Sequence, residues 1–431
     1  MLDAVLRAFR LPDVRQKILY TFGLLAVYRL AAHLPVPGVN VAALRSFFES
    51  NQLLGMLDMF SGGSLTTFSV AALGVYPYIT SSIIMQIIAP LIPSLQEMQK
   101  EGEAGRTRMA QYQRLLTVPL AMLQAYAQGT LLSRQSPPLL SNFGLFNRDT
   151  FIPTVSLILT LTAGTMFLVW LGELITEKGI GNGISLIIFA GIVSRLPTSV
   201  GQSVAAGTNW LGLIVLAFIG IGIVLGIIYM NEGQRRIQVH YAKRIRGNRM
   251  YGGTTSYLPM RVNSAGMIPL IFAMSIMLIP GTAATYFQAA QTPWIRSTAN
   301  AMVSLFHSTS WFYWLLYFWL VVAFTYFYTA VIFQQQNLPE TLQKQGGFIP
   351  GIRAGRPTAD YLNRVLTRIT LLGALFLGAV AIAPFIVGRA TSIQTLTLSS
   401  TGILIVVGVV LDTMKQLEAQ LMMRHYEGFI K

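Results

Sequence analysis

The chain has 431 residues and no Cys, and its 31 Lys and Arg outnumber its 16 Asp and Glu. Charged residues make up 11% of the chain and hydrophobic residues 53%, whereas about a quarter of the residues in a soluble domain are charged. This composition excludes a water-soluble globular protein, and the missing Cys excludes disulfides, thiolate metal sites and thiol nucleophiles.

Ten apolar stretches follow one another along the chain, and each approaches the roughly 20 residues that cross a bilayer as a helix. A short segment before the first stretch places Leu2, Val5, Leu6 and Phe9 on one side of a helix, which predicts an amphipathic helix lying on the membrane surface. The ten predicted spans cover residues 18–34, 75–92, 115–132, 151–171, 184–197, 210–230, 265–280, 311–333, 369–388 and 396–411.

Lys and Arg are divided unequally between the two sides of these spans. With the N-terminus inside, 24 of the 31 lie in inside segments, 5 lie in outside loops, and Arg29 and Arg195 lie within spans, where we expect them to snorkel to the interface. Because basic residues resist transfer across a membrane, both termini are predicted to be cytoplasmic. The net charge of +15 favours anionic lipids, nucleic acid or an acidic protein surface as partners.

Ten spans form two sets of five, and an odd number in each set inverts the second half relative to the first. The second span of each half is abnormal, since residues 65–92 carry Pro77 and Pro90 and residues 265–280 carry Pro269 and Pro280. Matching broken helices in two halves indicate a working site where the halves meet. The sequence therefore predicts an all-α polytopic membrane protein, with ten transmembrane helices arranged as two inverted five-helix halves around a central pore.

The predicted organisation follows from these spans. It comprises a cytoplasmic amphipathic N-terminal segment (1–17), an N-terminal half with spans one to five (18–197), an inter-half hinge loop (198–209), a C-terminal half with spans six to ten (210–411) and a cytoplasmic tail (412–431).

The sequence lacks the residues that would indicate chemistry or ion coupling. It contains no GxxxxGK[ST] phosphate loop, and its four His residues lie far apart. Its predicted spans hold no Asp or Glu near their middle, where ion-coupled carriers usually place one. We therefore expect a passive conduit rather than an enzyme, with no cofactor and no metal, driven by a partner.

Five motifs in register resemble bacterial SecY, the channel subunit of the general protein translocon. They read MFSGGSLTTFSVAALGVYPYITSSIIMQ from Met59, EGEAGR at 101–106, WLGELITEKGIGNGIS at 170–185, GQRRIQVHYAKR at 233–244 and GGFIPGIR at 346–353. The resemblance implies a channel in the bacterial cytoplasmic membrane that passes unfolded secretory polypeptides and releases hydrophobic helices sideways into lipid. It also implies as partners the small membrane subunits SecE and SecG, the motor ATPase SecA, the translating ribosome with its RNA, and secretory preproteins with their signal sequences.

Residues 58–69 are too polar and glycine-rich to face lipid, although they run directly into the second span. Irregular backbone at membrane depth is tolerated only inside a protein or a cavity. The resemblance implies that this stretch is a short half-helix that plugs the channel from outside. The residues assigned to the plug are Asp58, Met59, Phe60, Ser61, Gly62, Gly63, Ser64 and Leu65.

A ring of six aliphatic residues is implied at the narrowest point of the pore by matching the motifs. Such a ring excludes ions by dewetting while remaining indifferent to the sequence of a passing polypeptide. The six residues are Val75, Ile79, Ile184, Ile188, Ile271 and Ile405.

The two abnormal helices, 75–92 and 265–280, are implied to form a lateral gate. Polar side chains on or beside them are expected to form hydrogen bonds across this seam, each worth about 0.6 to 2 kcal/mol in a membrane. The polar residues assigned to the gate are Thr80, Ser82, Gln86 and Asn263.

Two long cytoplasmic loops, residues 231–261 and 334–368, combine basic and aromatic residues in a pattern that suits RNA phosphates and bases. The resemblance implies that they dock the ribosome and the motor ATPase. Arg353 is assigned to this docking, together with Arg235, Arg236, Arg246 and Arg249.

Two other functions fit parts of the pattern. A secondary carrier for a small solute shares inverted repeats and broken helices but needs a coupling site. A membrane-integral enzyme needs a catalytic acid, base or metal cluster within the spans, which the sequence does not offer.

Overall fold

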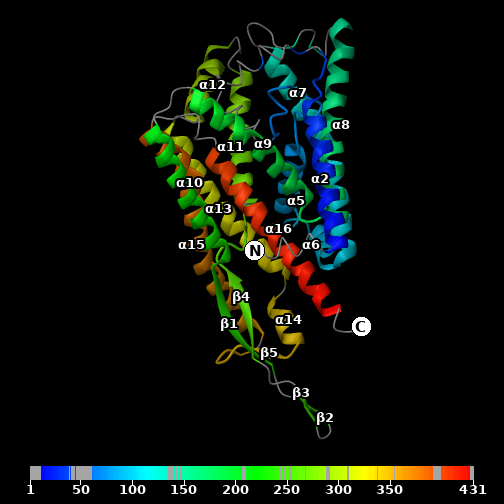
Figure 1. Ribbon diagram of the computed structural model, residues 1–431, viewed down its shortest axis with the longest axis vertical. Helices are drawn as coiled ribbons and strands as arrows, with labels where there is room; N and C mark the ends of the chain where they lie inside the picture. The colour runs from blue at the N-terminus through cyan, green and yellow to red at the C-terminus, as the bar shows by residue number, and fades with distance from the viewer. Residues whose placement is uncertain are drawn as a thin grey trace. The chain divides into compact units, whose positions relative to one another are not determined.

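The computed structural model describes most of the chain, and the fold is mainly helical (Figure 1). The described residues are 11–37, 39, 44, 61–133, 140, 143–144, 148–205, 210–241, 244–246, 249–251, 255–266, 268–287, 292–307, 310–336, 338–353, 355–391 and 399–427. The predicted surface helix before Pro12 and three assigned plug residues, Asp58, Met59 and Phe60, lie outside the described residues.

Each of the ten predicted spans falls on a helix. In chain order these helices are α2 (Pro12–His33), α5 (Tyr76–Ile88), α7 (Glu103–Ser133), α8 (Arg148–Lys178), α9 (Gly183–Ala205), α10 (Trp210–Glu232), α11 (Ile268–Phe287), α13 (Trp311–Gln336), α15 (Arg356–Thr391) and α16 (Ser399–Glu427). Shorter helices lie between them, namely α6 (Pro93–Lys100), α12 (Pro293–Leu305) and α14 (Leu338–Lys344).

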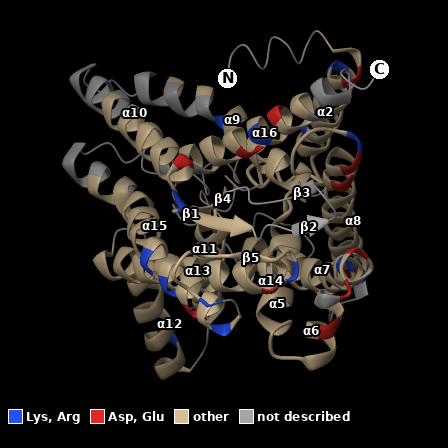
Figure 2. Cartoon of the chain, turned by 90° about the horizontal axis from the view of Figure 1, so that it is seen from below, with Lys and Arg blue, Asp and Glu red and all other residues tan. Residues whose placement is uncertain are grey.

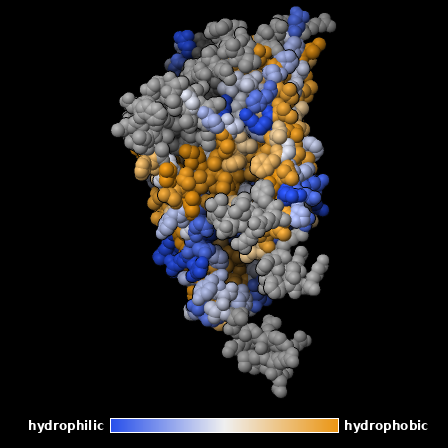
Figure 3. All heavy atoms as spheres, viewed as in Figure 1, coloured by the Kyte–Doolittle hydropathy of each residue, from blue (hydrophilic) through white to orange (hydrophobic). Residues whose placement is uncertain are grey.

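Several helices have the length and composition of membrane spans. In the described part of the chain, four helices are long and apolar enough to cross a bilayer, and the pair α5 and α6, bent by 105° at its break, would be a fifth. Large hydrophobic side chains such as Ile152 and Phe218 are about three-quarters exposed, and Figure 3 shows broad orange, hydrophobic areas on the surface. A surface of this kind suits lipid rather than water.

Contacts divide the chain into two compact units. The first unit comprises Met1–Trp210, Leu278–Ser310 and Ile393–Lys431, and the second comprises Leu211–Met277 and Trp311–Ser392. In the first unit α7 packs against α5 and α8, while α9 packs against α8 and α16.

The connection between α8 and α9 is tight because glycines bring the two backbones together. A Cβ at Gly183 would lie 1.8 Å from the carbonyl oxygen of Gly172, so a larger residue cannot fit. The Asn182 side-chain oxygen accepts a hydrogen bond from the Ser185 amide and so caps the first turn of α9. This connection fixes the direction in which α9 leaves α8.

The second unit pairs α13 with α15 and adds strands, so the all-α prediction needs a correction. The strands are β1 (Gln234–Tyr241), β2 (Arg244–Arg246), β3 (Arg249–Tyr251), β4 (Thr255–Arg261) and β5 (Gly347–Phe348). They form an antiparallel sheet in the order β4-β1-β5 and a separate β2-β3 hairpin. Strands arise in the predicted loops because Ile237 and Val239 alternate with polar residues along β1.

The three-stranded sheet has its own hydrophobic core. Ile237, Val239 and Met260 lie in one cluster with residues of α14 and α15, among them Leu342 and the fully buried Leu362. The sheet is therefore an anchored part of the second unit rather than a free loop.

Candidate functional site

The site begins with residues 61–75, which we call the turn segment. It forms consecutive turns leading into α5, so the half-helix prediction is wrong over its described residues. Gly62 and Gly63 have φ values of 67° and 91°, and Gly74 has a φ of 57°. Such left-handed conformations are natural for glycine and turn the chain instead of continuing a helix.

The turn segment lies against α2. The guanidinium of Arg29 donates a hydrogen bond to the carbonyl oxygen of Gly62 at 3.0 Å, and the hydroxyl of Tyr28 donates one to the carbonyl oxygen of Ser61 at 3.4 Å. Further along, the Val70 amide donates to the Leu34 carbonyl at 2.9 Å. The segment is thus bound through its backbone to the end of α2.

Helix α9 contacts the same segment through a glycine and an arginine. A Cβ at Gly191 would lie 2.7 Å from the Cα of Gly62, so the two backbones touch. The Arg195 guanidinium donates a hydrogen bond to the hydroxyl oxygen of Thr66 at 2.8 Å. The sequence predicts that Arg29 and Arg195 snorkel to the interface, and the structure adds that both contact the turn segment.

Apolar packing completes the seat of the turn segment. Its Leu65, Phe68 and Leu73 belong to one buried cluster with Ala121 and Ala125 of α7. On the α8 side, a Cβ at Gly164 would lie 1.9 Å from the carbonyl oxygen of Val70. Small residues on the surrounding helices therefore allow this irregular backbone to fit inside the first unit.

The assigned pore residues of the first unit lie at the end of the turn segment and on α5, α9 and α16. Val75 ends the turn segment, Ile79 lies one turn further on in α5, both are buried, and Ile405 of α16 is 1% exposed. Ile184 and Ile188 lie one turn apart on α9, on the helix face that also carries Gly191 and Arg195.

Two pore residues have surroundings of their own. Ile184 packs over Gly172 of α8. A Cβ added to Gly172 would lie 2.5 Å from the Cδ1 atom of Ile184. Ile271 belongs to α11 in the second unit and is partly buried.

The assigned gate residues have local hydrogen-bond partners. Thr80 bonds to the Tyr76 carbonyl within α5, the Gln86 amide nitrogen donates to Ser82 at 3.2 Å, and the Asn263 amide donates to Asn231 at 2.8 Å. The side-chain oxygens of Gln86 and Asn263 are buried and have no hydrogen-bond partner among the described residues. Each therefore retains the capacity for one more hydrogen bond.

The assigned docking residues are only partly brought together. Arg235 and Arg236 are both exposed. Because adjacent residues of a strand point to opposite faces, the two side chains lie on opposite faces of the sheet. Arg236 shares its face with Arg261, Tyr257 and Phe348, as the strand register shows.

Arg353 is also exposed, in the loop between β5 and α15, where its carbonyl accepts a hydrogen bond from Thr358. Arg246 and Arg249 pair through their backbones in the β2-β3 hairpin, and their side chains lie outside the described part. Figure 2 shows basic residues in blue along α15. This helix carries the exposed Arg364 and Arg368.

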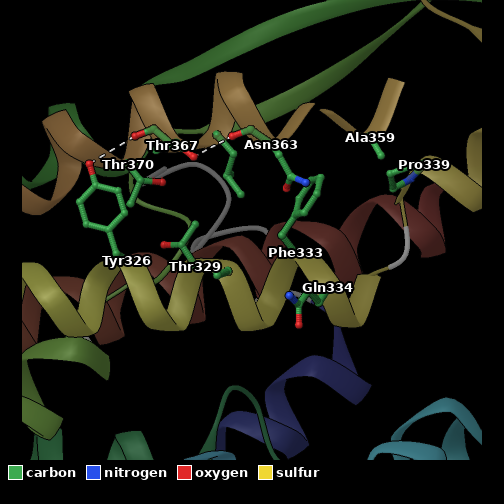
Figure 4. Close-up of a pocket in the computed structure, with 11 residues that line it drawn as sticks. Tyr326, Thr329, Phe333, Gln334, Pro339, Ala359, Asn363, Thr367 and Thr370 are labelled. Carbon is green, nitrogen blue, oxygen red and sulfur yellow. Dashed lines mark hydrogen bonds between the residues drawn. The ribbon is translucent and has the colours of Figure 1, made fainter. Parts of the chain in front are cut away.

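A cavity of about 300 Å³, lined by both apolar and uncharged polar side chains, lies between α13 and α15 in the second unit. Figure 4 shows Tyr326 reaching across it to the carbonyl oxygen of Thr367, at 3.4 Å, and Thr367 bonding to the carbonyl oxygen of Asn363 at 2.8 Å. None of its described lining residues carries a charge. Among the described residues no group of three or more His, Asp or Glu is placed to hold a metal ion.

Comparison with known proteins identifies the family. The SecY family model matches residues 69–414. The protein translocase subunit SecY of Thermotoga maritima is 43% identical over 100% of this chain and 98% of its own length, and that of Mycobacterium tuberculosis is 42% identical over the full length of both. The chain belongs to the SecY family. The predicted resemblance is thereby confirmed.

Solved structures agree on the fold. The structure of a protein-conducting channel is similar with a TM-score of 0.60 at 17% identity, covering 94% of this chain and 91% of that one. A SecY structure described for its plug domain gives a TM-score of 0.62 with the same identity and coverage, and Sec61 in a canine ribosome–channel complex gives 0.58 at 16% identity, covering 94% and 91%. The fold of SecY-family channels therefore extends over nearly the whole chain.

Proposed function

We propose that this chain forms the pore through which unfolded secretory polypeptides cross the bacterial cytoplasmic membrane, and from which hydrophobic helices leave sideways into lipid. Full-length relatives above 40% identity are protein translocase subunits, and this observation carries the proposal. The chain is a protein-conducting channel and a multi-pass membrane protein. Its work is binding and gating, with no catalytic step, and the energy comes from a partner.

The proposed topology has ten spans in two inverted halves, with both termini in the cytoplasm. The domain boundaries are those expected from the sequence: residues 1–17, 18–197, 198–209, 210–411 and 412–431. A helix at each of the ten predicted stretches and the excess of basic residues in alternate loops support this arrangement. The inversion would place the abnormal helices α5 and α11 in equivalent positions of the two halves.

The turn segment is proposed to be the plug of the resting channel, together with residues 58–60. Its irregular, buried backbone is expected where a chain lies inside a protein rather than against lipid. The α9 face that contacts it also carries Ile184 and Ile188, so plug and pore residues share one helix surface. When the plug leaves, the aliphatic ring would grip the moving polypeptide without reading its sequence.

Replacing Ile79, Ile188 and Ile271 together by Ser tests the ring. Hydroxyl groups would let water wet the narrowest part of the pore, so we expect ion conductance of the resting channel in planar bilayers to rise. Ile152→Ser on the exposed face of α8 is the matched control, and its conductance should stay at the level of the original chain. Equal conductance in the triple variant and the control would refute the pore assignment.

The lateral gate is proposed to lie between α5 and α11. The buried side-chain oxygens of Gln86 and Asn263, which lack partners among the described residues, support this because each can accept one further hydrogen bond. Hydrogen bonds of about 0.6 to 2 kcal/mol would favour a closed seam but yield to an arriving hydrophobic helix.

Docking of the driving partners is proposed at the three-stranded sheet and the Arg353 loop. Exposed Arg236, Arg261 and Tyr257 combine positive charge with an aromatic side chain on one face, as RNA or acidic protein surfaces require. The proposed partners are the ribosome with its RNA and the motor SecA. We further propose SecE and SecG as membrane subunits, signal sequences as ligands, and anionic lipids at the basic cytoplasmic surface.

A further inference from the structure

We propose that Arg29 and Arg195 are paired positioning residues that hold the plug in its seat when the channel is at rest. This inference rests on the proposed role of the turn segment as the plug. Arg29 comes from α2 and Arg195 from α9, and each donates a hydrogen bond to the turn segment. Charged residues within apolar helices are costly to keep there, which indicates that they serve a function.

The two hydrogen bonds hold the segment from two different helices. Arg29 contacts the carbonyl oxygen of Gly62 at 3.0 Å, and Arg195 contacts the hydroxyl oxygen of Thr66 at 2.8 Å. The acceptors lie four residues apart and the donors come from different helices. The two bonds add to the apolar packing of Leu65, Phe68 and Leu73 and oppose a shift of the segment from two directions.

The turn segment leaves room for the Arg195 guanidinium at Gly63. A Cβ at Gly63 would lie 2.9 Å from Nε and 3.3 Å from Nη2 of Arg195, so a side chain at this position would push the guanidinium aside. Gly63 also has a φ of 91°, which other residues rarely adopt. Space and conformation therefore both favour glycine at the point where Arg195 passes the turn segment.

The neutral charge of both acceptors makes this attachment reversible. A guanidinium paired with a buried carboxylate would leave an uncompensated charge when the pair separates, which is strongly unfavourable. A backbone carbonyl and a hydroxyl carry no net charge, and water in an opened channel can replace the arginine as their partner. Charge-assisted hydrogen bonds to neutral groups are strong enough to hold the plug yet can be broken without separating opposite charges.

The absence of Cys in the natural chain allows a direct test with one introduced thiol. Ser64 is fully buried in the turn segment, so Ser64→Cys should react slowly with a membrane-impermeant maleimide at rest. Full-length chain in membrane vesicles would be compared with and without R29Q and R195Q. We expect the double variant to react about tenfold faster, because loss of charge-assisted hydrogen bonds shifts an equilibrium by at least this order. R29K with R195K should stay within about twofold of the original rate, since an ammonium can still donate.

Two controls separate the possible failures. Ala374→Cys reports on buried α15 in the second unit, and faster labelling there in the double variant would mean general loosening and would refute a specific role. A secretory preprotein arrested in the channel should by itself speed labelling of Ser64→Cys. If arrest speeds labelling but the double variant does not, the arginines do not hold the plug. If arrest leaves labelling unchanged, the turn segment is not a moving plug, and the proposal fails with it.

Discussion

The turn segment and the three-stranded sheet are stabilised in different ways. The turn segment has no helix or extended strand, and it is held by a buried apolar cluster with α7, by glycine contacts and by isolated hydrogen bonds from α2 and α9. The sheet is held by a continuous ladder between β1 and β4 and by a hydrophobic core with α14 and α15. Over its described residues, the proposed plug therefore has no continuous backbone ladder to break when it moves, whereas the proposed docking surface has one that can transmit force without unfolding.

Leu362→Ala should have the largest effect, because it removes a fully buried side chain from the core of the sheet. Such substitutions cost about 2 to 5 kcal/mol, so we expect a clear drop in the unfolding temperature of the purified protein. Leu372→Ala on the same helix, at a position 60% exposed, should change it little. An equal effect of the two substitutions would contradict the view of the sheet as a packed, permanent platform.

Gly191→Ala should displace the turn segment, at a cost in stability of about 1 to 3 kcal/mol from overpacking. The added Cβ would lie 2.7 Å from the Gly62 Cα, so the segment must shift away from α9. We expect resting ion conductance in planar bilayers to rise roughly tenfold. This corresponds to a shift of about 1.4 kcal/mol in the equilibrium between the closed and the displaced turn segment. Gly201→Ala, on the same helix with nothing within 4 Å of its Cβ, is the control. No leak in Gly191→Ala would mean that the contact with α9 does not seal the channel.

The sequence predicted regions whose structure depends on local pattern. The apolar composition predicted a helix at every span, and the structure has one at each. This works because a helix satisfies its backbone hydrogen bonds within one continuous segment and needs no distant partner. The sheet was missed because its alternation is short, with Ile237 and Val239 as its only buried positions on β1, and the surrounding arginines indicated a solvated loop.

The role of the two arginines could not be read from local sequence either. Arg29 meets Gly62 and Arg195 meets Thr66 only through the tertiary fold, since 33 and 129 residues separate the partners. The signal available in the sequence was a cation within each of two apolar stretches. That signal suggests a function but does not name the partner.

Arg353→Glu tests the docking surface, and its effect should be smaller than that of losing the plug seat. The side chain is exposed in the loop before α15, so stability should change by less than about 0.5 kcal/mol. Reversing its charge would repel an acidic or nucleic-acid partner, and we expect motor-driven translocation into vesicles to fall several-fold while the protein itself still inserts into the membrane. Equal loss of translocation and insertion would indicate misfolding. Arg296→Glu on exposed α12 serves as the matched charge reversal and should leave translocation unchanged.

Gln86→Leu should have the smallest effect, because the bond to Ser82 that it removes lies within α5 and only one hydrogen bond across the proposed gate is at stake. A bond of about 0.6 kcal/mol in a membrane corresponds to roughly a threefold change in an equilibrium, and the buried oxygen of Gln86 has no described partner to lose. If this oxygen contributes to closure, a marginally hydrophobic signal helix should insert about threefold more efficiently into the variant. Ile87→Leu on the adjacent, partly exposed position should not alter insertion. Less efficient insertion into Gln86→Leu would instead show that the amide helps the gate to open. Polar groups would then hold the turn segment in place but would not keep the gate at α5 closed.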